Sequence, residues 1–236
     1  MARVAIGRAP VPFTELDMLE VLTVPATETP TALVVWLHGL GASGDDFVPV
    51  VPMMKMPWVH WAFPNAPIQP VTVNGGYRMP SWYDILHMEP GPGRENLDDV
   101  RASAAAVDRV IQASLSTHNI PASRVVIAGF SQGGAVAMEL LTHGTRVFAG
   151  SAVLSSYWAT DDTPPSSVNA GTPTFFGHGR ADAMVPVDRG QAAHDALRDA
   201  GRTVSWQDYP MGHEVCVQEL QSLATELRTW VPRETS

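Results

Sequence analysis

A serine stands at a sharp corner between an expected strand and an expected helix. The stretch 124–141 reads RVVIAGFSQGGAVAMELL, in which a β-prone run leads into Gly129, Ser131 and Gly133 before a helical run begins. Such a corner needs glycine on both sides, because strand and helix pass close together and the serine backbone is strained. The simpler interpretation is an ordinary turn, since glycine and serine are turn residues. In either case the chain runs from a buried strand directly into a helix, as α/β folds do.

Strand-like and helical patterns alternate along most of the chain. We expect strands at 19–24, 31–38, 58–64, 124–130, 148–156, 172–179 and 203–210, and helices at 94–117, 132–143, 187–200 and 214–230. Several strands are continuously apolar, as in a parallel sheet covered on both faces, and the first is expected to be an antiparallel edge. The stretches 64–94 and 161–173 are rich in proline and glycine and are expected to be irregular. The pattern predicts one α/β domain over 1–236, with sites beyond the carboxyl ends of the strands.

The composition excludes several classes of protein. The chain has 236 residues, 45% of them hydrophobic, which suits a globular protein of one or two domains. Its net charge of −9 argues against binding to nucleic acid and to an anionic membrane surface. The one cysteine, Cys216, permits neither an internal disulfide nor a cysteine-based zinc site. The first 18 residues lack the apolar core of a signal peptide, and no run reaches a membrane span, so we expect a cytoplasmic protein without stable membrane insertion.

The corner serine could act as a nucleophile only with a base and an acid. A base must remove the hydroxyl proton, and a carboxylate must orient that base. In a chain whose nucleophile lies at a strand-to-helix corner of this kind, called a nucleophile elbow, the three residues follow one another in the order serine, acid, histidine. Asp182 lies in FFGHGRADAMVP (175–186), just past an apolar strand and before an expected helix. The alternative role for Asp182 is a turn or helix cap, although Asp188 is better placed to cap that helix. We therefore predict that Asp182 is the acid that follows Ser131.

His213 is the histidine that completes this order. It lies in WQDYPMGHEV (206–215), between the last expected strand and the last expected helix. Two other histidines at strand ends, His38 and His178, each precede a glycine and are interpreted as packed scaffold residues. The ordered set Ser131, Asp182 and His213 is more specific than any single member.

A second glycine motif competes for interpretation. The segment WLHGLGASGDDF (36–47) spells Gly-x-Gly-x-x-Gly over Gly39–Gly44, which after a strand resembles a dinucleotide-binding fingerprint. The context argues against a nucleotide: the next strand ends in Phe-Pro-Asn without an acidic residue for the ribose. Asp45 and Asp46 would repel a pyrophosphate, and the prolines that follow interrupt the helix that such a unit needs. We prefer an oxyanion loop, in which the backbone N–H groups of Leu40 and Gln132 face the nucleophile.

Six segments resemble a known family. They are LHGLGASGDDF, FPNAP, PVTVNGGYRMPSWYDI, GFSQGGAVA, HGRADAMVP and YPMGHEV, and they run in this order between about residues 31 and 216. Together they resemble the bacterial carboxylesterase/acyl-protein thioesterase/lysophospholipase family of small α/β-hydrolases. The resemblance implies the α/β-hydrolase fold, Ser131 as nucleophile, Asp182 as acid, His213 as base, and Leu40 with Gln132 as oxyanion donors. It also implies that no metal or cofactor takes part, and it is compatible with a homodimer.

Two segments depart from the family pattern. The acid loop reads RADAM where the family often has Asp-Pro-Val, and HMEPGPGREN (87–96) is unusually rich in proline and glycine. The second segment follows SWYDI, which resembles the family's loop over the acyl site. We therefore expect Trp82, Ile85, Leu86 and Met88 to contact the acyl chain and to influence its preferred length. The alternative is a surface loop whose aromatic side chains merely pack.

The sequence thus predicts a serine hydrolase with a Ser-His-Asp triad and an acyl-enzyme intermediate. The expected substrates are small-molecule carboxylic esters, or thioesters or lysophospholipids, of small to medium acyl chain. Two other classes stay open: a catalytically silent ligand-binding protein on the same fold, and a nicotinamide-dependent oxidoreductase that uses the Gly39–Gly44 loop.

Overall fold

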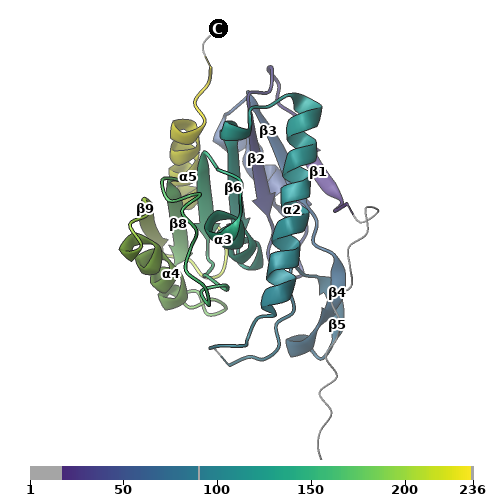
Figure 1. Cartoon of the computed structure of the whole chain (residues 1–236), viewed down its shortest axis with the longest axis vertical. Helices are drawn as coiled ribbons and strands as arrows, with labels where there is room; N and C mark the ends of the chain where they lie inside the picture. Colours follow the sequence, from purple (N-terminus) through teal and green to yellow (C-terminus); the bar gives the residue numbers. More distant parts are fainter. Residues whose placement is uncertain (1–17, 90, 235–236) are drawn as a thin grey trace, which may run out of the picture.

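The central element is a seven-stranded, mainly parallel sheet (Figure 1). The computed structural model describes residues 18–89 and 91–234, so the N-terminal segment discussed above as lacking a signal peptide lies almost entirely outside the described residues. The strand order is β1-β3-β2-β6-β7-β8-β9, and β1 alone is antiparallel to its neighbour. The strands are β1 (Val21–Val24), β2 (Ala32–Leu37), β3 (Val59–Pro64), β6 (Val125–Phe130), β7 (Gly150–Leu154), β8 (Thr174–Gly179) and β9 (Val204–Tyr209). The predicted α/β class and the antiparallel edge strand are confirmed.

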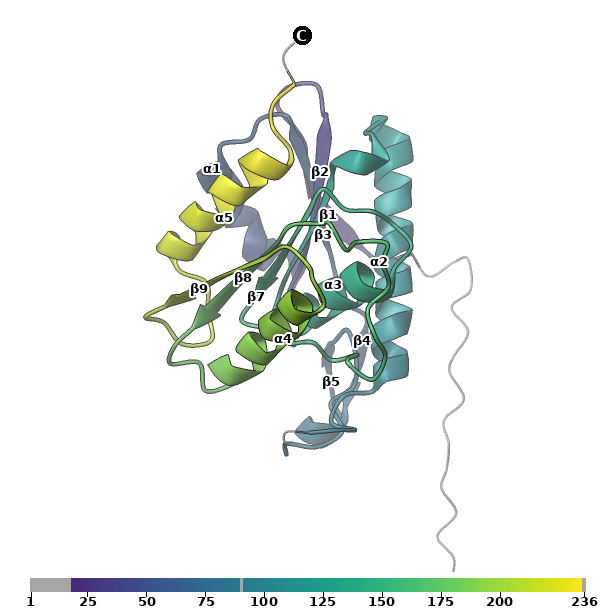
Figure 2. The same ribbon diagram turned by 60° about the vertical axis from the view of Figure 1, so that its left-hand side comes forward.

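Helices cover both faces of this sheet (Figure 2). One face carries α2 (Leu97–His118), α3 (Gln132–His143) and α4 (Val187–Asp199), and the other carries α1 (Val51–Met54) and α5 (Val217–Trp230). A 3-10 helix, Gly44–Val50, leads into α1. Among residues 18–89 and 91–234, no helix combines the length and the apolarity that crossing a membrane requires.

The central strands are apolar throughout because both of their faces are covered. All six residues of β2, ALVVWL, are buried. Alternate side chains of a strand point to opposite faces, so Leu33 and Val35 join the cluster that contains Val107 of α2. Trp36 points the other way and joins Leu223 of α5. A continuously apolar run is therefore what this position in the sheet requires.

Two helices begin three residues later than predicted. We predicted a helix from residue 94, whereas α2 begins at Leu97 because the Asn96 side chain accepts the Asp99 backbone N–H at 3.3 Å. The last helix begins at Val217, not 214, so that 213–216 remain a loop. The suggestion that Asp188 caps α4 was wrong, because the capping position is occupied by Pro186.

A β-hairpin occupies part of the stretch that we expected to be irregular. Strands β4 (Ile68–Val71) and β5 (Tyr77–Pro80) pair antiparallel, with a short 3-10 helix, Thr72–Asn74, at the turn. Gly75 and Gly76 both adopt positive φ angles there, at 66° and 79°. Proline is tolerated in such a strand because two-stranded hairpins leave edge positions without a hydrogen-bonding neighbour. The hairpin projects from the sheet at its carboxyl end (Figure 1).

Candidate active site

Ser131 occupies a strained corner between β6 and α3. Its backbone angles are φ 53° and ψ −120°, a region that residues other than glycine rarely adopt. A Cβ atom on Gly129 would lie 2.2 Å from the Gly133 carbonyl oxygen, and one on Gly133 would lie 2.5 Å from the Leu37 carbonyl oxygen. Both glycines are therefore required by backbone contact, which an ordinary turn does not explain. The corner presents the Ser131 side chain at the carboxyl end of the sheet.

The structure brings Ser131, His213 and Asp182 together although they lie far apart in the sequence. His213, in the loop after β9, has its Nε2 atom 2.9 Å from Ser131 Oγ. Its Nδ1 atom lies 2.7 Å from Asp182 Oδ2. A carboxylate can only accept, so Nδ1 carries the hydrogen and Nε2 is free to accept from the serine hydroxyl. This tautomer is the one in which the imidazole can remove the hydroxyl proton.

Asp182 is held in place by its second oxygen. Its side chain is fully buried, and Oδ1 accepts the backbone N–H groups of Met184 at 2.9 Å and Val185 at 2.8 Å. His178 packs alongside, with Nε2 2.9 Å from the Val185 carbonyl oxygen and 3.6 Å from Asp182 Oδ2. Burial lowers the pKa of His178, so this ring is neutral and donates to the carbonyl. The histidine interpreted as a scaffold residue thus supports the acid loop.

The Gly39–Gly44 loop lies directly beside the corner. A Cβ atom on Gly39 would lie 3.3 Å from Ser131 Cβ, so the backbone that leads into Leu40 closely approaches the hydroxyl-bearing residue. The backbone N–H of Gly41 donates to the Pro80 carbonyl at 2.8 Å, which ties the loop to β5. Gln132 is the first residue of α3, where a helix leaves its N–H groups without an intrahelical acceptor. The two N–H groups predicted to face an oxyanion are thus carried by segments that flank Ser131.

His38 fixes the start of that loop. Its Nδ1 atom lies 2.7 Å from the Gly39 carbonyl oxygen, and its Nε2 atom accepts the Ala66 backbone N–H at 3.0 Å. Burial lowers the pKa of His38, so the ring stays neutral and keeps both contacts. Trp82 Nε1 donates to the His38 carbonyl oxygen at 2.9 Å.

The backbone N–H groups of the Gly39–Gly44 loop that a dinucleotide would need already donate to other acceptors within the protein. The Gly44 N–H, at the start of the 3-10 helix, donates to Asn65 Oδ1 at 2.7 Å. The Ser43 N–H donates to Asp46 Oδ2 at 3.2 Å. The helix that follows is a short 3-10 helix with Pro49 inside it. These N–H groups are therefore not available to a pyrophosphate.

The Gln132 side chain has a role that the sequence did not reveal. Its Oε1 atom accepts the Trp82 backbone N–H at 2.8 Å, and its Nε2 atom donates to the Tyr83 carbonyl at 2.7 Å and to Ser81 Oγ at 3.0 Å. The segment 81–83 is thereby fastened to the corner. Ser156 Oγ donates to the Ser131 carbonyl oxygen at 2.5 Å from the other side.

The four residues predicted to contact the acyl chain do not form one surface. Trp82 and Ile85 are buried and belong to the apolar core beneath α2. Leu86 and Met88 are exposed, at 43% and 72%. Their predicted role in acyl binding stays a prediction, and the buried pair can act only as the packing behind the site.

Known proteins resemble this chain over most of its length. The family model described as Phospholipase/Carboxylesterase matches residues 20–231. Acyl-protein thioesterase 1 of Neurospora crassa is 34% identical over 226 residues, which cover 90% of this chain and 92% of that protein. Acyl-protein thioesterase 1 of Mycosarcoma maydis is 36% identical over 228 residues, covering 87% and 93%. These relatives are fungal, whereas the sequence motifs suggested a bacterial branch.

Solved structures show the same arrangement of the chain. Arabidopsis thaliana SOBER1 has a TM-score of 0.76 and 30% sequence identity, covering 84% of this chain and 98% of that one. Zea mays acyl-protein thioesterase 2 has a TM-score of 0.77 and 26% identity, covering 90% and 99%. Each of these two matches therefore covers most of this chain and nearly all of the solved structure.

Proposed function

This chain belongs to the phospholipase/carboxylesterase family of α/β-hydrolases, and from that premise we propose that it hydrolyses esters or thioesters through Ser131, His213 and Asp182. That it acts on ester or thioester bonds follows from the family. The single observation that supports the catalytic residues is the continuous relay from Ser131 Oγ through His213 to Asp182, on a corner with a positive φ angle. The proposed substrates are small-molecule esters or thioesters of small to medium acyl chain.

Acylation begins when Ser131 Oγ attacks the carbonyl carbon of the substrate. His213 Nε2 takes the hydroxyl proton as the Oγ–C bond forms, and buried Asp182 stabilises the imidazolium through Nδ1–H. The carbonyl oxygen becomes an oxyanion, which accepts hydrogen bonds from the Leu40 and Gln132 backbone N–H groups. His213 then returns the proton to the departing alcohol or thiol as the bond to the acyl carbon breaks.

Deacylation repeats these steps with water. His213 Nε2 takes a proton from the water as its oxygen attacks the acyl carbon, and the same two N–H groups hold the second oxyanion. The Oγ–C bond breaks, His213 protonates Ser131 Oγ, and the carboxylic acid leaves. Each proton stays between Ser131, His213 and the reacting oxygen or sulfur atoms.

Substitution of Ser131 tests the assignment of the nucleophile. Ser131→Ala should abolish hydrolysis of p-nitrophenyl butyrate and labelling by a fluorophosphonate probe, because no other hydroxyl lies against His213 Nε2 among the described residues. Ser116→Ala, an exposed serine on α2, is the matched control and should keep both activities. Thermal unfolding should show that both variants are folded. Turnover by folded Ser131→Ala above background would contradict the proposal.

A further inference from the structure

Trp82 lies behind the proposed oxyanion site and contacts both segments that supply its N–H groups. The residue is 1% exposed. Its indole Nε1–H donates to the His38 carbonyl oxygen at 2.9 Å, and its backbone N–H donates to Gln132 Oε1 at 2.8 Å. His38 lies two residues before Leu40, and Gln132 supplies the second N–H itself. Trp82 therefore connects the loop and the helix that flank Ser131.

The His38 carbonyl oxygen lies where the Gly39–Gly44 loop meets α3. A Cβ atom on Gly133 would lie 2.6 Å from this oxygen, so the oxygen packs directly against the backbone of the helix. The loop approaches the nucleophile in the next residue, where a Cβ atom on Gly39 would lie 3.3 Å from Ser131 Cβ. The indole N–H thus meets its acceptor at the point of closest backbone contact. A shift of this carbonyl group would move the loop relative to the nucleophile.

The next peptide group supplies the first of the two proposed donors. Its carbonyl belongs to Gly39 and its N–H to Leu40, and in a planar trans peptide these two groups point in opposite directions. His38 Nε2 accepts the Ala66 N–H, so Nδ1 carries the ring hydrogen and donates to the Gly39 carbonyl oxygen at 2.7 Å. The direction of the Leu40 N–H therefore depends on the position of His38, and the indole of Trp82 holds the His38 carbonyl.

The other end of the connection is equally fixed. Gln132 Nε2 donates to the Tyr83 carbonyl oxygen at 2.7 Å, in addition to the bond between Gln132 Oε1 and the Trp82 N–H. Ser103 of α2 donates to the Trp82 carbonyl oxygen through its hydroxyl. The backbone N–H, the backbone carbonyl and the indole N–H of Trp82 are therefore all paired, and together they orient the ring toward the loop.

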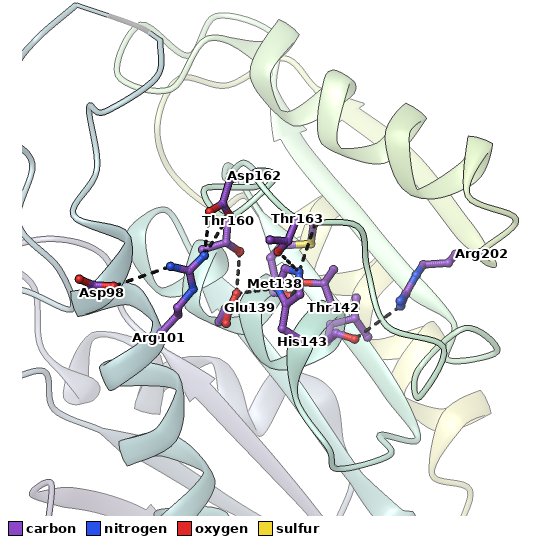
Figure 3. Close-up of polar contacts among 11 residues, drawn as sticks. Asp98, Arg101, Met138, Glu139, Thr142, His143, Thr160, Asp162, Thr163 and Arg202 are labelled. Carbon is purple, nitrogen blue, oxygen red and sulfur yellow. Dashed lines mark hydrogen bonds and ion pairs between the residues drawn. The ribbon is translucent and has the colours of Figure 1, made fainter.

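A hydroxyl, an imidazole and a carboxylate are joined a second time at the end of α3 (Figure 3). There His143 Nδ1 lies 2.8 Å from Glu139 Oε2, and His143 Nε2 lies 2.9 Å from Thr163 Oγ1. These distances are close to those of the proposed triad. Thr163, however, lies between β7 and β8, in a described stretch of chain that contains no helix, and its φ angle is not left-handed. The relay alone therefore does not distinguish Ser131, whereas the flanking loop and helix N-terminus do.

Resting on the proposed hydrolase function, we propose that Trp82 is a positioning residue that sets the spacing of the Leu40 and Gln132 N–H groups around the oxyanion. It acts from behind the site, through the His38 carbonyl and the Gln132 side chain. Both acylation and deacylation depend on it, because the same two N–H groups hold both oxyanions. Its effect arises only when negative charge develops on the carbonyl oxygen, so it lowers the barrier without strengthening substrate binding.

Trp82→Phe tests the proposal because it keeps an aromatic ring and removes the indole N–H. For p-nitrophenyl butyrate, kcat should fall by about tenfold to a hundredfold while KM stays within about twofold, since misplaced donors stabilise the transition state less. The inhibition constant of a trifluoromethyl ketone, which forms a tetrahedral adduct with a catalytic serine, should rise by the same factor as kcat/KM falls.

Trp58→Phe is the matched control. Trp58 Nε1 also donates to a backbone carbonyl, that of Val231, at 2.9 Å, and both residues belong to the apolar cluster on the other face of the sheet. The control therefore loses the same kind of hydrogen bond at a distance from the site. It should keep the wild-type kcat and inhibition constant when it is assayed in its folded state.

Gln132→Met tests the same connection from the helix. It removes the amide that holds Trp82 and Tyr83 and keeps the backbone N–H of residue 132. It should also lower kcat at constant KM. The double variant with Trp82→Phe should lose little more than the worse of the two single variants, because both interrupt one connection. If Trp82→Phe does not fold, Gln132→Met decides alone, and a wild-type kcat in that variant overturns the proposal.

The outcomes separate this proposal from the one on which it rests. An active wild type, with an unchanged kcat and inhibition constant in folded Trp82→Phe, overturns the positioning role alone. A raised KM at constant kcat also overturns it, because Trp82 would then contribute to substrate binding. An equal fall of kcat in Trp58→Phe, or full additivity in the double variant, overturns it as well. A wild type that hydrolyses no ester overturns both proposals.

Discussion

Asp182 performs two tasks with two different oxygens. Oδ2 receives the His213 Nδ1–H, whereas Oδ1 receives two backbone N–H groups of its own loop. The loop therefore orients the carboxylate, and the carboxylate orients the imidazole. Because the side chain is fully buried, no water can replace either set of contacts.

Asp182→Asn should lower kcat for p-nitrophenyl butyrate by about 10⁴. The amide nitrogen would donate where the carboxylate accepts, so Nδ1 would lose its hydrogen and Nε2 would carry it instead. The imidazole could then no longer accept the Ser131 proton. Asp188→Asn, an exposed neighbour in the same segment, is the matched control and should keep the wild-type rate. A near-wild-type kcat in Asp182→Asn would move the acid role to another residue.

At the scale of elements, the β6–α3 corner is a contact between two backbones. The atoms nearest to a Cβ on Gly129 are the carbonyl oxygen and carbon of Gly133 and the nitrogen of Gly134. Backbone atoms cannot change rotamer, so any side chain at this position must move the helix away from the strand.

Gly129→Ala should therefore lower the free energy of unfolding by about 1–3 kcal/mol, as overpacking does. It should also lower the rate of ester hydrolysis under conditions in which the variant is still folded. The displaced helix would carry Ser131 and the Gln132 N–H away from His213. Gly171→Ala is the control, because no atom lies within 4 Å of its Cβ position and its φ angle is not left-handed. Urea unfolding and ester hydrolysis, measured on both variants, separate the two effects. Equal stability of the two variants would contradict this account of the corner.

Elements were predictable where local composition decides the structure. Strand β2 is apolar throughout because helices cover both faces of the sheet, and an unbroken apolar run of this kind can be recognised in the sequence itself. The β4–β5 hairpin was not predicted, because Pro70 and the pair Gly75-Gly76 are typical of irregular loops. Its strands are stabilised by each other and by contacts with distant segments, which a single stretch of sequence does not contain.

The same contrast holds for the site. The order of Ser131, Asp182 and His213 along the chain, each after an expected strand, was enough to predict that they meet. The pairing of the Gln132 side chain with Trp82 was not, since 50 residues separate them and the elbow motif assigns no role to this side chain. Leu86 and Met88, which the sequence neighbourhood suggested as acyl contacts, have exposed side chains, and their role in acyl binding stays a prediction.

At the scale of the whole molecule, a buried acid links stability to pH. Glu219 of α5 is fully buried, and neither carboxyl oxygen has a hydrogen-bond partner among the described residues. Its carboxyl packs against β8, because a Cβ on Gly177 would lie 2.2 Å from Oε1. Burial raises the pKa of Glu219 to about 8, although the nearby Cys216 backbone N–H acts in the opposite direction. The neutral acid is therefore the form that the fold accommodates.

The free energy of unfolding should fall as pH rises from about 4.5 to about 8, because the unfolded chain releases this proton first. The contribution of Glu219 is fully present below the unfolded pKa and is lost above the folded one, a change on the order of 5 kcal/mol. Glu219→Gln stays neutral, so its stability relative to the wild type should increase between pH 5 and pH 9 in urea unfolding. Glu226→Gln makes the same charge change on the same helix, and its free energy of unfolding relative to the wild type should not change between pH 5 and pH 9. If the stability of Glu219→Gln relative to the wild type were also independent of pH, the buried carboxyl would not resist ionisation.

The position of His213 in the fold ties the proposed chemistry to one edge of the sheet. His213 lies in the loop between β9 and α5, and among the described strands β9 pairs with β8 alone. The contact of the imidazole with Ser131 Oγ therefore depends on an edge strand, whereas Ser131 itself follows a strand that is paired on both sides. Local opening of this edge would withdraw the imidazole while leaving the corner folded, so in the proposed mechanism the molecule would lose its activity before it lost its core.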